Sequence, residues 1–337
     1  MSYPGLVTAA LAVMFVLLFA PTTAFAATGD AYLTIVSGGS VLRAARSASG
    51  AWTGFSRIPG VPGQARSVDE VMVGGQRNLM VLTSSGLYHS VLTSNGWGPF
   101  SDIVGRGAGQ PDIDFTIGGG GVGGRVSAAN AGGVLHVVLT GIGQATHTYR
   151  DANGGWARFN QGALRQRRGH IRNADATGLP NGQLYVAVSS LGKPGTPYHA
   201  VRFPDGTWSN LAGVPAPAGL TMGVSFVSTA ALKDQVHVVV TVAGTARVYD
   251  AIRYADGTWT GLTDITGQTG PCGGGPIAAS GDGTGQLHIV ITGYPNNFGL
   301  LHSVRLTSGR WTALSNVKSV AGELGPAEWV GLSAEQA

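Results

Sequence analysis

The sequence has a single cysteine and few acidic residues. Cys272 is the only cysteine, so the chain can form no internal disulfide and needs a packed core or a closed topology for stability. Charged residues make up 11% of the chain, and only 17 are acidic. A glycosidase needs two placed carboxylates, or a tyrosine with an acid partner. The shortage of acids therefore leaves few candidate catalytic pairs.

Long apolar runs are missing after residue 26. Before it, Leu6 to Ala20 is almost wholly apolar, and Ala24-Phe25-Ala26 has the A-x-A pattern of a signal-peptide cleavage site. We therefore expect residues 1–26 to be a signal peptide and residues 27–337 to form a single domain. The mature protein is expected to be secreted, with no membrane span after cleavage.

Helical periodicity is also missing after residue 26, and a repeat takes its place. Six units share a β-branched run, a small-residue turn, a second run usually ending in Arg, a polar turn and a Trp. The repeated tryptophans are Trp52, Trp97, Trp156, Trp208, Trp259 and Trp311. Successive tryptophans are separated by 45, 59, 52, 51 and 52 residues.

Each unit has room for four short strands in about 50 residues, which is typical of a β-propeller blade. Ala-, Ser- and Gly-rich segments such as RVSAANAG and VSFVSTAA precede five of the units and suit the crowded centre. The first unit has no such segment before it, whereas the chain ends in AEWVGLSAEQA with no unit after it. We therefore predict an all-β, six-bladed propeller whose C-terminal strand completes the first blade and closes the ring.

Two-residue turns would fix the register between the second and third strands of four blades. Turns at 38–39, 84–85, 141–142 and 243–244 place certain residues directly opposite one another on one face. The predicted pairs are Thr34 with Arg43, Met80 with His89, His136 with His147, and His237 with Asp250. By analogy, Tyr185 lies near His199 and His288 near His302. Seven of the eight histidines occupy these positions, and His170 is the exception.

Three interpretations of this histidine pattern remain open. A cross-strand pair could hold a metal, but zinc needs three or four protein ligands and no third is evident. The histidines could pack between blades, bonded to backbone or water. They could also line a ligand pocket with Arg as a polar group and Trp as a stacking face, which suits sugars. The sequence implies no cofactor.

The blade unit, ending in D-G-x-W and preceded by an Ala/Ser-rich strand, resembles the six-bladed fucose-binding lectins of fungi and bacteria. It resembles the tectonin-type propeller lectins more loosely. In the fucose lectins an Arg on the second strand, a Glu on the third and an aromatic hold the sugar. The resemblance covers essentially all of residues 27–337 and implies a carbohydrate-binding propeller.

No unit of this chain keeps the Arg–Glu pair. The resemblance carries the Arg position onto Thr34, Met80, His136, Tyr185, His237 and His288. It carries the Glu position onto Arg43, His89, His147, His199, Asp250 and His302. The aromatic position falls on Arg46, Leu92, Arg150, Arg202, Arg253 and Arg305. The resemblance thus predicts the scaffold, with different chemistry at the sites.

A sialidase-like glycoside hydrolase is the enzyme alternative, because sialidases also use six-bladed propellers. The two D-G-T-W copies, at Asp205–Trp208 and Asp256–Trp259, lack two residues of the sialidase Asp-box. Other units use different residues where these have Asp, so we interpret Asp-Gly as a turn. The remaining acid pairs are Asp112 with Asp114 and Asp69 with Glu70. Cys272 lies in a predicted turn, which does not favour a nucleophile.

The sequence as a whole favours a secreted, multivalent, lectin-like propeller that binds a glycan or cell-surface polysaccharide and is not an enzyme. A protein-interaction or structural propeller without sugar sites is the alternative. The one basic cluster (Arg165, Arg167, Arg168, Arg172) lacks interleaved aromatics, so no nucleic-acid partner is expected, and we interpret it as a solvated loop. The candidate binding residues are His136, His147, Arg150, Trp156, Tyr185, His199, Arg202, Trp208, His237, Asp250, Arg253, Trp259, His288, His302, Arg305 and Trp311.

Overall fold

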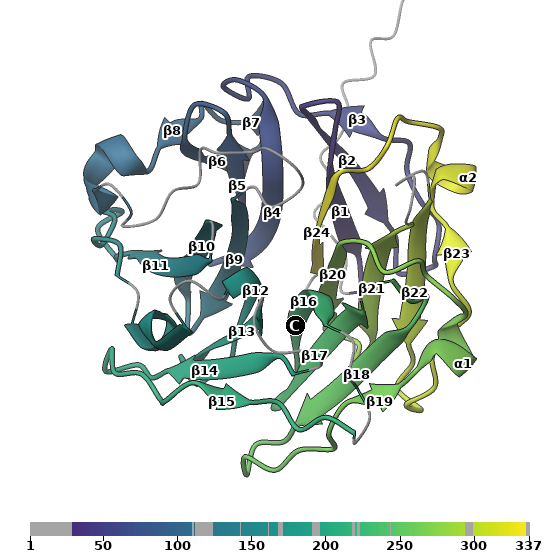
Figure 1. Ribbon diagram of the computed structural model, residues 1–337. Helices are drawn as coiled ribbons and strands as arrows, with labels where there is room; N and C mark the ends of the chain where they lie inside the picture. The colour runs from purple at the N-terminus through teal and green to yellow at the C-terminus, as the bar shows by residue number, and fades with distance from the viewer. Residues whose placement is uncertain are drawn as a thin grey trace, which may run out of the picture.

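A computed structural model shows a six-bladed β-propeller with six sheets arranged as a ring (Figure 1). The structure describes residues 29–109, 111, 124–141, 143–160, 162–167, 171–190, 196–217, 220, 223–242, 244–293 and 299–334. The expected signal peptide lies outside these residues, as do Asp112, Asp114 and His170. The predicted fold class is confirmed.

Blades 1 to 3 form the first half of the ring, and their strands are given from the innermost outwards. Blade 1 has β24 (Trp329–Ala334), β1 (Ala31–Ser37), β2 (Ser40–Arg46) and β3 (Ser56–Arg57). Blade 2 has β4 (Ala65–Val73), β5 (Gln76–Thr83), β6 (Leu87–Thr93), and both β7 (Gly96–Trp97) and β8 (Ser101–Asp102) against β6. Blade 3 has β9 (Arg125–Ala131), β10 (Val134–Gly141) and β11 (Gln144–Arg150), with isolated bridges in place of an outer strand.

Blades 4 to 6 each have four strands, again given from the innermost outwards. Blade 4 has β12 (Ile171–Gly178), β13 (Leu184–Ser190), β14 (Tyr198–Arg202) and β15 (Ala212–Gly213). Blade 5 has β16 (Val224–Leu232), β17 (Gln235–Val242), β18 (Val248–Arg253) and β19 (Thr263–Asp264). Blade 6 has β20 (Ile277–Gly281), β21 (Leu287–Thr292), β22 (Leu300–Arg305) and β23 (Ser315–Asn316).

Among the described residues, helical structure is confined to four short turns between strands. They are the π-helical turn η1 (Val104–Ala108), the 3₁₀ turn η2 (Gly162–Arg167), α1 (Thr266–Thr269) and α2 (Lys318–Ala321). The predicted basic cluster is not one solvated loop, because Arg165 lies on η2 whereas Arg172 lies in β12. In the described part of the chain no helix is long and apolar enough to span a bilayer.

The ring closes as the sequence predicts. Strand β24 pairs with β1 in antiparallel register from Ala31↔Ala334 to Val36↔Trp329, which places yellow β24 beside purple β1 in Figure 1. The last described residues of the chain therefore form the inner strand of the first blade. This pairing removes two free sheet edges that would otherwise be open to pairing with other chains.

Small residues line the centre because the inner strands approach one another closely. A Cβ atom on Gly178 of β12 would collide with the Asn130 carbonyl oxygen of β9, and one on Gly281 of β20 would collide with that of Ala231 in β16. Side chains of one inner strand also accept backbone N–H groups of the next. These bonds are Ala128→Asp69 (2.8 Å), Ala176→Ser127 (3.0 Å), Thr229→Asp175 (2.6 Å), Ala279→Ser228 (2.9 Å) and Ala334→Ser280 (2.9 Å).

The apolar core is divided among the blade interfaces. Six clusters of buried side chains each join two neighbouring blades, one cluster for every interface of the ring. Each blade thus buries both faces, which explains why its middle strands are almost continuously apolar, as in β17. Blade-to-blade packing supplies the stability that no disulfide provides, since Cys272 is free and buried.

Candidate functional site

Five of the six residues at the predicted third-strand positions meet the tryptophan of the following blade. Four of these contacts join a histidine to the indole. The ring centroids are 5.6 Å apart for His89–Trp156, 5.5 Å for His147–Trp208, 5.0 Å for His199–Trp259 and 5.3 Å for His302–Trp52. At the interface of blades 1 and 2, the Arg43 guanidinium lies 5.9 Å from the Trp97 ring. We call each such cluster an inter-blade site.

The position of these residues is the same in all six blades relative to the outer strand. Each pairs with an outer-strand or bridge residue 12 or 13 positions further along the chain. The pairs are Arg43↔Ser56, His89↔Ser101, His147↔Asn160, His199↔Ala212, Asp250↔Thr263 and His302↔Ser315. The repeat therefore delivers one polar side chain to the same place on every blade.

The predicted register between second and third strands is correct in two blades and wrong in two others. Thr34↔Arg43 and Met80↔His89 pair directly, as expected. His136 instead pairs with Tyr149, and His237 pairs with Ile252. The β10–β11 ladder ends at Gly141↔Gln144, and the β17–β18 ladder ends at Thr241↔Val248. A shift of two residues keeps every side chain on its face, so the expected partners still meet diagonally.

The diagonal partners make close polar contacts. His136 Nδ1 and His147 Nε2 are 2.9 Å apart, and His288 Nδ1 and His302 Nε2 are 3.1 Å apart. His237 Nδ1 lies 3.1 Å from both carboxylate oxygens of Asp250. Tyr185 stacks on His199 with ring centroids 5.1 Å apart.

Burial divides the predicted site residues into two layers. The inner layer is buried and consists of His136, His147, Trp156, Tyr185, His237, Asp250, His288, His302 and Trp311. The outer layer is half-buried and consists of Arg150, His199, Arg202, Trp208, Arg253, Trp259 and Arg305. The outer layer alone is open to a ligand in this conformation, and the inner layer supports it.

Five histidines of the inter-blade sites have a lowered pKa and are neutral at pH 7. Burial, followed by the positive charge of an arginine on the next blade, lowers the pKa of His89, His136 and His199 to about 4. Burial also lowers the pKa of His147 and His302 well below the usual value, with smaller effects from their histidine partners and the facing arginines. These shifts follow from moving a cation out of water and towards another cation.

Several buried polar atoms at these sites have no hydrogen-bond partner among the described residues. They are His147 Nδ1, Tyr185 Oη, His199 Nδ1 and His237 Nε2. Leaving a buried polar group unpaired costs about 1–3 kcal/mol. Three of the six interfaces therefore hold buried polar atoms that the described protein groups leave without a hydrogen-bond partner.

The arginines of the outer layer are locked in a repeated geometry. Each bridges to the tryptophan six residues later, as in Arg202↔Trp208 and Arg253↔Trp259. The Gly four residues after each Arg has a positive φ, such as +89° at Gly206, and lies under the guanidinium. A Cβ placed on Gly206 would be 3.4 Å from Arg202 Nη2. The spacing R-x₃-G-x-W occurs in five blades, with Leu92 replacing Arg in blade 2.

The Asp of D-G-T-W closes a turn, as predicted. Asp205 Oδ1 accepts the Thr207 N–H at 2.9 Å and the Thr207 hydroxyl at 2.7 Å, and Asp256 does the same for Thr258. These bonds orient the chain for the Arg–Trp bridge. The carboxylate therefore has a structural role.

The interface of blades 1 and 2 differs in charge. Glu70 accepts bonds from Arg43 Nε at 2.8 Å and from Arg77 Nη1 at 2.8 Å, and its carboxylate is fully buried. Both guanidinium groups also lie over the Tyr32 ring, at 4.2 and 3.3 Å. Burial raises the pKa of Glu70, but the two arginines outweigh it and the net pKa is lowered.

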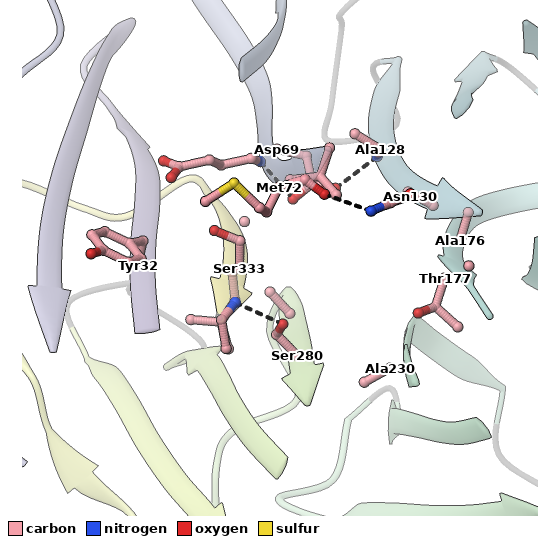
Figure 2. A pocket seen from close by; sticks show the side chains of 18 of the residues that line it. Tyr32, Asp69, Met72, Ala128, Asn130, Ala176, Thr177, Ala230, Ser280 and Ser333 are labelled. Atoms are coloured by element: carbon pink, nitrogen blue, oxygen red, sulfur yellow. Dashed lines mark hydrogen bonds between the residues drawn. The ribbon is translucent and has the colours of Figure 1, made fainter. Parts of the chain in front are cut away.

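A cavity of about 1190 Å³ occupies the middle of the ring. Figure 2 shows Asp69, Asn130, Thr177, Ser280 and Ser333 around it, one from each of five inner strands. We call this cavity the central well. Sequence analysis did not anticipate it, although the polar residues among the Ala-rich inner strands were a signal for it.

Aromatic and arginine side chains cross the axis at the N-terminal ends of the inner strands. The Arg125 guanidinium lies 3.9 Å from the Trp329 ring and 5.8 Å from Phe226, and Phe226 and Trp329 are 6.0 Å apart. Arg172 lies 6.0 Å from Phe226. These residues come from blades 1, 3, 4 and 5, so they join opposite sides of the ring at this end.

The acid pairs considered for catalysis are engaged elsewhere or lie outside the described residues. Asp69 Oδ2 accepts Ala128 N–H and Oδ1 accepts its neighbour's N–H at 3.0 Å. Burial, and then the charge of Asp175, raises the pKa of Asp69. Burial likewise raises the pKa of the Cys272 thiol. Within the described ranges, no three potential ligands cluster as a metal site would require.

Sequence analysis missed three residues that complete the inter-blade sites. The Asn78 amide oxygen lies 2.9 Å from His89 Nε2, and Asp282 lies 3.3 Å from His288 Nε2. Tyr149 stacks near His147 and lies 5.1 Å from the Arg202 guanidinium. Tyr149 is two residues from His147, so strand alternation could have placed it on the same face.

No family model and no curated protein matches the sequence. Solved structures do match the fold. AofleA from Arthrobotrys oligospora is 15% identical with a TM-score of 0.56, covering 92% of this chain and 90% of its own. The BP39L lectin from Burkholderia pseudomallei is 17% identical with a TM-score of 0.57, covering 87% and 82%.

A chain of a nidogen/laminin complex also matches, with 12% identity, a TM-score of 0.54, and coverage of 91% of this chain and 100% of its own. Identities this low establish a common fold. The expected likeness to lectin-type six-bladed propellers is therefore confirmed at the level of architecture.

Proposed function

We propose that this chain is a secreted carbohydrate-binding propeller with repeated inter-blade sites and no catalytic activity. A glycan or cell-surface polysaccharide is the expected partner. The proposal rests on the recurrence, at four interfaces, of a histidine of one blade against the tryptophan of the next. The BP39L lectin, which shares the fold, supports the same class of function.

The chemistry of the outer layer suits a sugar. Half-buried Trp208 and Trp259 offer aromatic faces for C–H groups, and Arg202 and Arg253 beside them offer planar donors for hydroxyl oxygens. A polyhydroxylated ligand can use the aromatic face and the guanidinium at once.

Repetition of weak sites can raise the overall affinity for a polymer. Several sites on one rigid ring can engage a polymer together, so that the second contact becomes intramolecular and overall avidity rises. Secretion is part of the proposal because the N-terminal 26 residues have the pattern of an export signal.

A protein-interaction or structural propeller is the alternative, favoured by two observations. The inner layer is buried as ordinary packing would be, and the matching nidogen/laminin structure is a protein–protein complex. In this alternative, the histidines and tryptophans would hold blades together and bind no sugar.

A glycan array with residues 27–337, followed by calorimetry on any hit, separates the two. The proposal expects binding with more than one site per chain, and His302→Ala or Arg305→Ala should remove or weaken one site of several. Absence of bound glycan at high protein concentration contradicts the proposal. Binding with unchanged stoichiometry and affinity in both variants would place the sites elsewhere.

A further inference from the structure

We propose that the inter-blade sites of blades 2/3, 3/4 and 4/5 take saccharides that carry a carboxylate, such as uronic or sialic acid units. This inference rests on the proposed carbohydrate function and deepens it. The residues that would bind the carboxylate are Arg150, Arg202 and Arg253, each of which faces a histidine of the preceding blade beside a tryptophan.

The three guanidinium groups are displayed rigidly. The backbone of each arginine bridges that of its own tryptophan, and each guanidinium lies over the glycine of the turn between them. Arg150 Nε donates to the Gly154 carbonyl oxygen at 3.2 Å, and Arg202 Nη1 donates to that of Phe203 at 3.4 Å. Fixed in this way, an Arg loses little entropy when it binds a planar anion.

None of the three forms an ion pair with a carboxylate among the described residues. The acids nearest in sequence are already engaged by their own turns: Asp151 by the N–H groups of Asn153 and Gly155, and Asp205 and Asp256 by threonines. Glu70, the most strongly paired acid, serves Arg43 and Arg77 at another interface. A half-buried guanidinium with no carboxylate still has donors for a bidentate partner.

The exposed carboxylates of Asp205 and Asp256 act on Arg202 and Arg253 from their turns but form no ion pair with them. The groups that face the guanidiniums are His89, the His136–His147 pair, and Tyr185 with His199, and all of them are uncharged at neutral pH. The site therefore combines one cation, neutral ring nitrogens and an indole face. That set matches a sugar ring with one carboxylate.

The other interfaces provide an internal contrast. At blades 5/6 the third-strand position is Asp250, which supplies a carboxylate of its own. At blades 6/1 Asp282 bonds to His288, and its charge acts on Arg46. At blades 1/2 the arginine position is Leu92, and Arg43 is paired with Glu70. We therefore restrict the acidic-sugar sites to three of the six interfaces.

The experiment is a glycan array in which galacturonic, glucuronic and sialic acid glycans are paired with their methyl esters. Each ester keeps the ring and removes only the charge. Residues 27–337 should bind the best acid at least about tenfold more tightly than its ester, as expected for a charge-assisted bidentate bond. Raising the salt concentration should reduce this difference, because an exposed ion pair is screened.

Variants locate the sites on the ring. Arg150→Gln, Arg202→Gln and Arg253→Gln should each lower the number of acid-preferring sites by one, and the triple variant should bind acid and ester alike. Arg202→Lys keeps the positive charge but not the planar, bidentate donor of the guanidinium, so it should lose part of the preference for the acid over its ester. Arg57→Gln, on the exposed outer strand β3, removes the same charge outside these clusters and serves as the control.

Each outcome decides the question. Equal binding of acids and esters, or preference for neutral glycans, overturns this inference and leaves the proposed function standing. Binding of no glycan at all overturns both. An acid preference that persists in the triple variant, with an unchanged melting temperature, places the anion site elsewhere and also overturns the inference.

Discussion

His147 and Trp208 meet edge to face across the boundary of blades 3 and 4, with ring centroids 5.5 Å apart and planes at 81°. The edge of one ring meets the face of the other, an arrangement that aromatic pairs favour over face-to-face stacking. Two further interfaces repeat the edge-to-face contact with different partners, and at a third His199 meets Trp259 at a tilt of 52°. The tryptophan that marks each repeat therefore belongs as much to the preceding blade as to its own.

Replacing Trp208 with Ala should destabilise the fold at this boundary. The change removes a half-buried indole from its contact with His147 and from the cluster around Leu164 and Ile171. We expect the free energy of unfolding to fall by about 2–3 kcal/mol, below the range for a fully buried Trp. Urea titration followed by fluorescence measures the change. Trp208→Phe keeps a ring and should lose less; equal losses would mean that the ring contact contributes nothing.

Acidification should destabilise the protein between about pH 6.5 and 4. His89, His136 and His199 have a folded pKa of about 4, and their ordinary value is 6.5. In that window the unfolded chain binds more protons than the folded chain, so stability is full above pH 6.5 and decreases as the pH falls. Each histidine contributes at most about 1.4 kcal/mol per pH unit to the slope.

Two carboxyls oppose this trend. Burial raises the pKa of Asp69 and Asp175, so the folded state holds their protons at a pH where the unfolded chain has released them. Chemical denaturation at pH 7, 6, 5 and 4.5 gives the net slope. His89→Gln removes one proton-binding group while its amide can still bond to Asn78, and it should make the slope shallower. A slope that is unchanged in His89→Gln contradicts the assignment of His89 as neutral in the folded state.

Much of the fold could be predicted from the sequence because the repeat is long, regular and physically constrained. The six tryptophans identified the blades, and the missing first inner strand identified the closure by β24. Turn positions were less certain. Residues 141–144 allow a two-residue turn in more than one frame, and the observed pairing of β10 with β11 is two residues away from the predicted register. Period-two alternation kept the face correct even where the pairing was wrong.

Burial within the site could not be predicted in the same way. The sequence places His147 on a face but does not tell whether that face is open or covered by the next blade. The structure covers it with Trp208 and leaves Arg202 at the edge. The central well was missed for a similar reason, since Asp69, Asp175 and Ser280 come from inner strands that meet only when the ring closes.

Removing Glu70, the buried acid between blades 1 and 2, should lower the free energy of unfolding. Glu70→Ala leaves the guanidinium groups of Arg43 and Arg77 without their shared carboxylate, and loss of one partner of a buried ion pair costs about 3–5 kcal/mol. Urea unfolding of Glu70→Ala measures this loss. The triple change Glu70→Leu, Arg43→Met and Arg77→Met removes all three charges and should recover much of it. If the triple variant is less stable than Glu70→Ala, the charge network makes a net contribution to stability, and its ion-pair energy exceeds its desolvation cost.

Removing the C-terminal strand β24 should destabilise the whole ring. A chain that ends at Glu328 lacks β24, which leaves β1 with an unpaired edge and removes Val330 and Leu332 from the cluster between blades 6 and 1. It also removes the Ala334 N–H bond to Ser280, at 2.9 Å, which ties blade 1 to blade 6. We expect calorimetry to show a melting temperature lowered by well over about 10 °C, since several kcal/mol are lost together. A chain that ends at Ala334 keeps the strand and serves as the control. Equal melting temperatures for the two chains would contradict closure by β24.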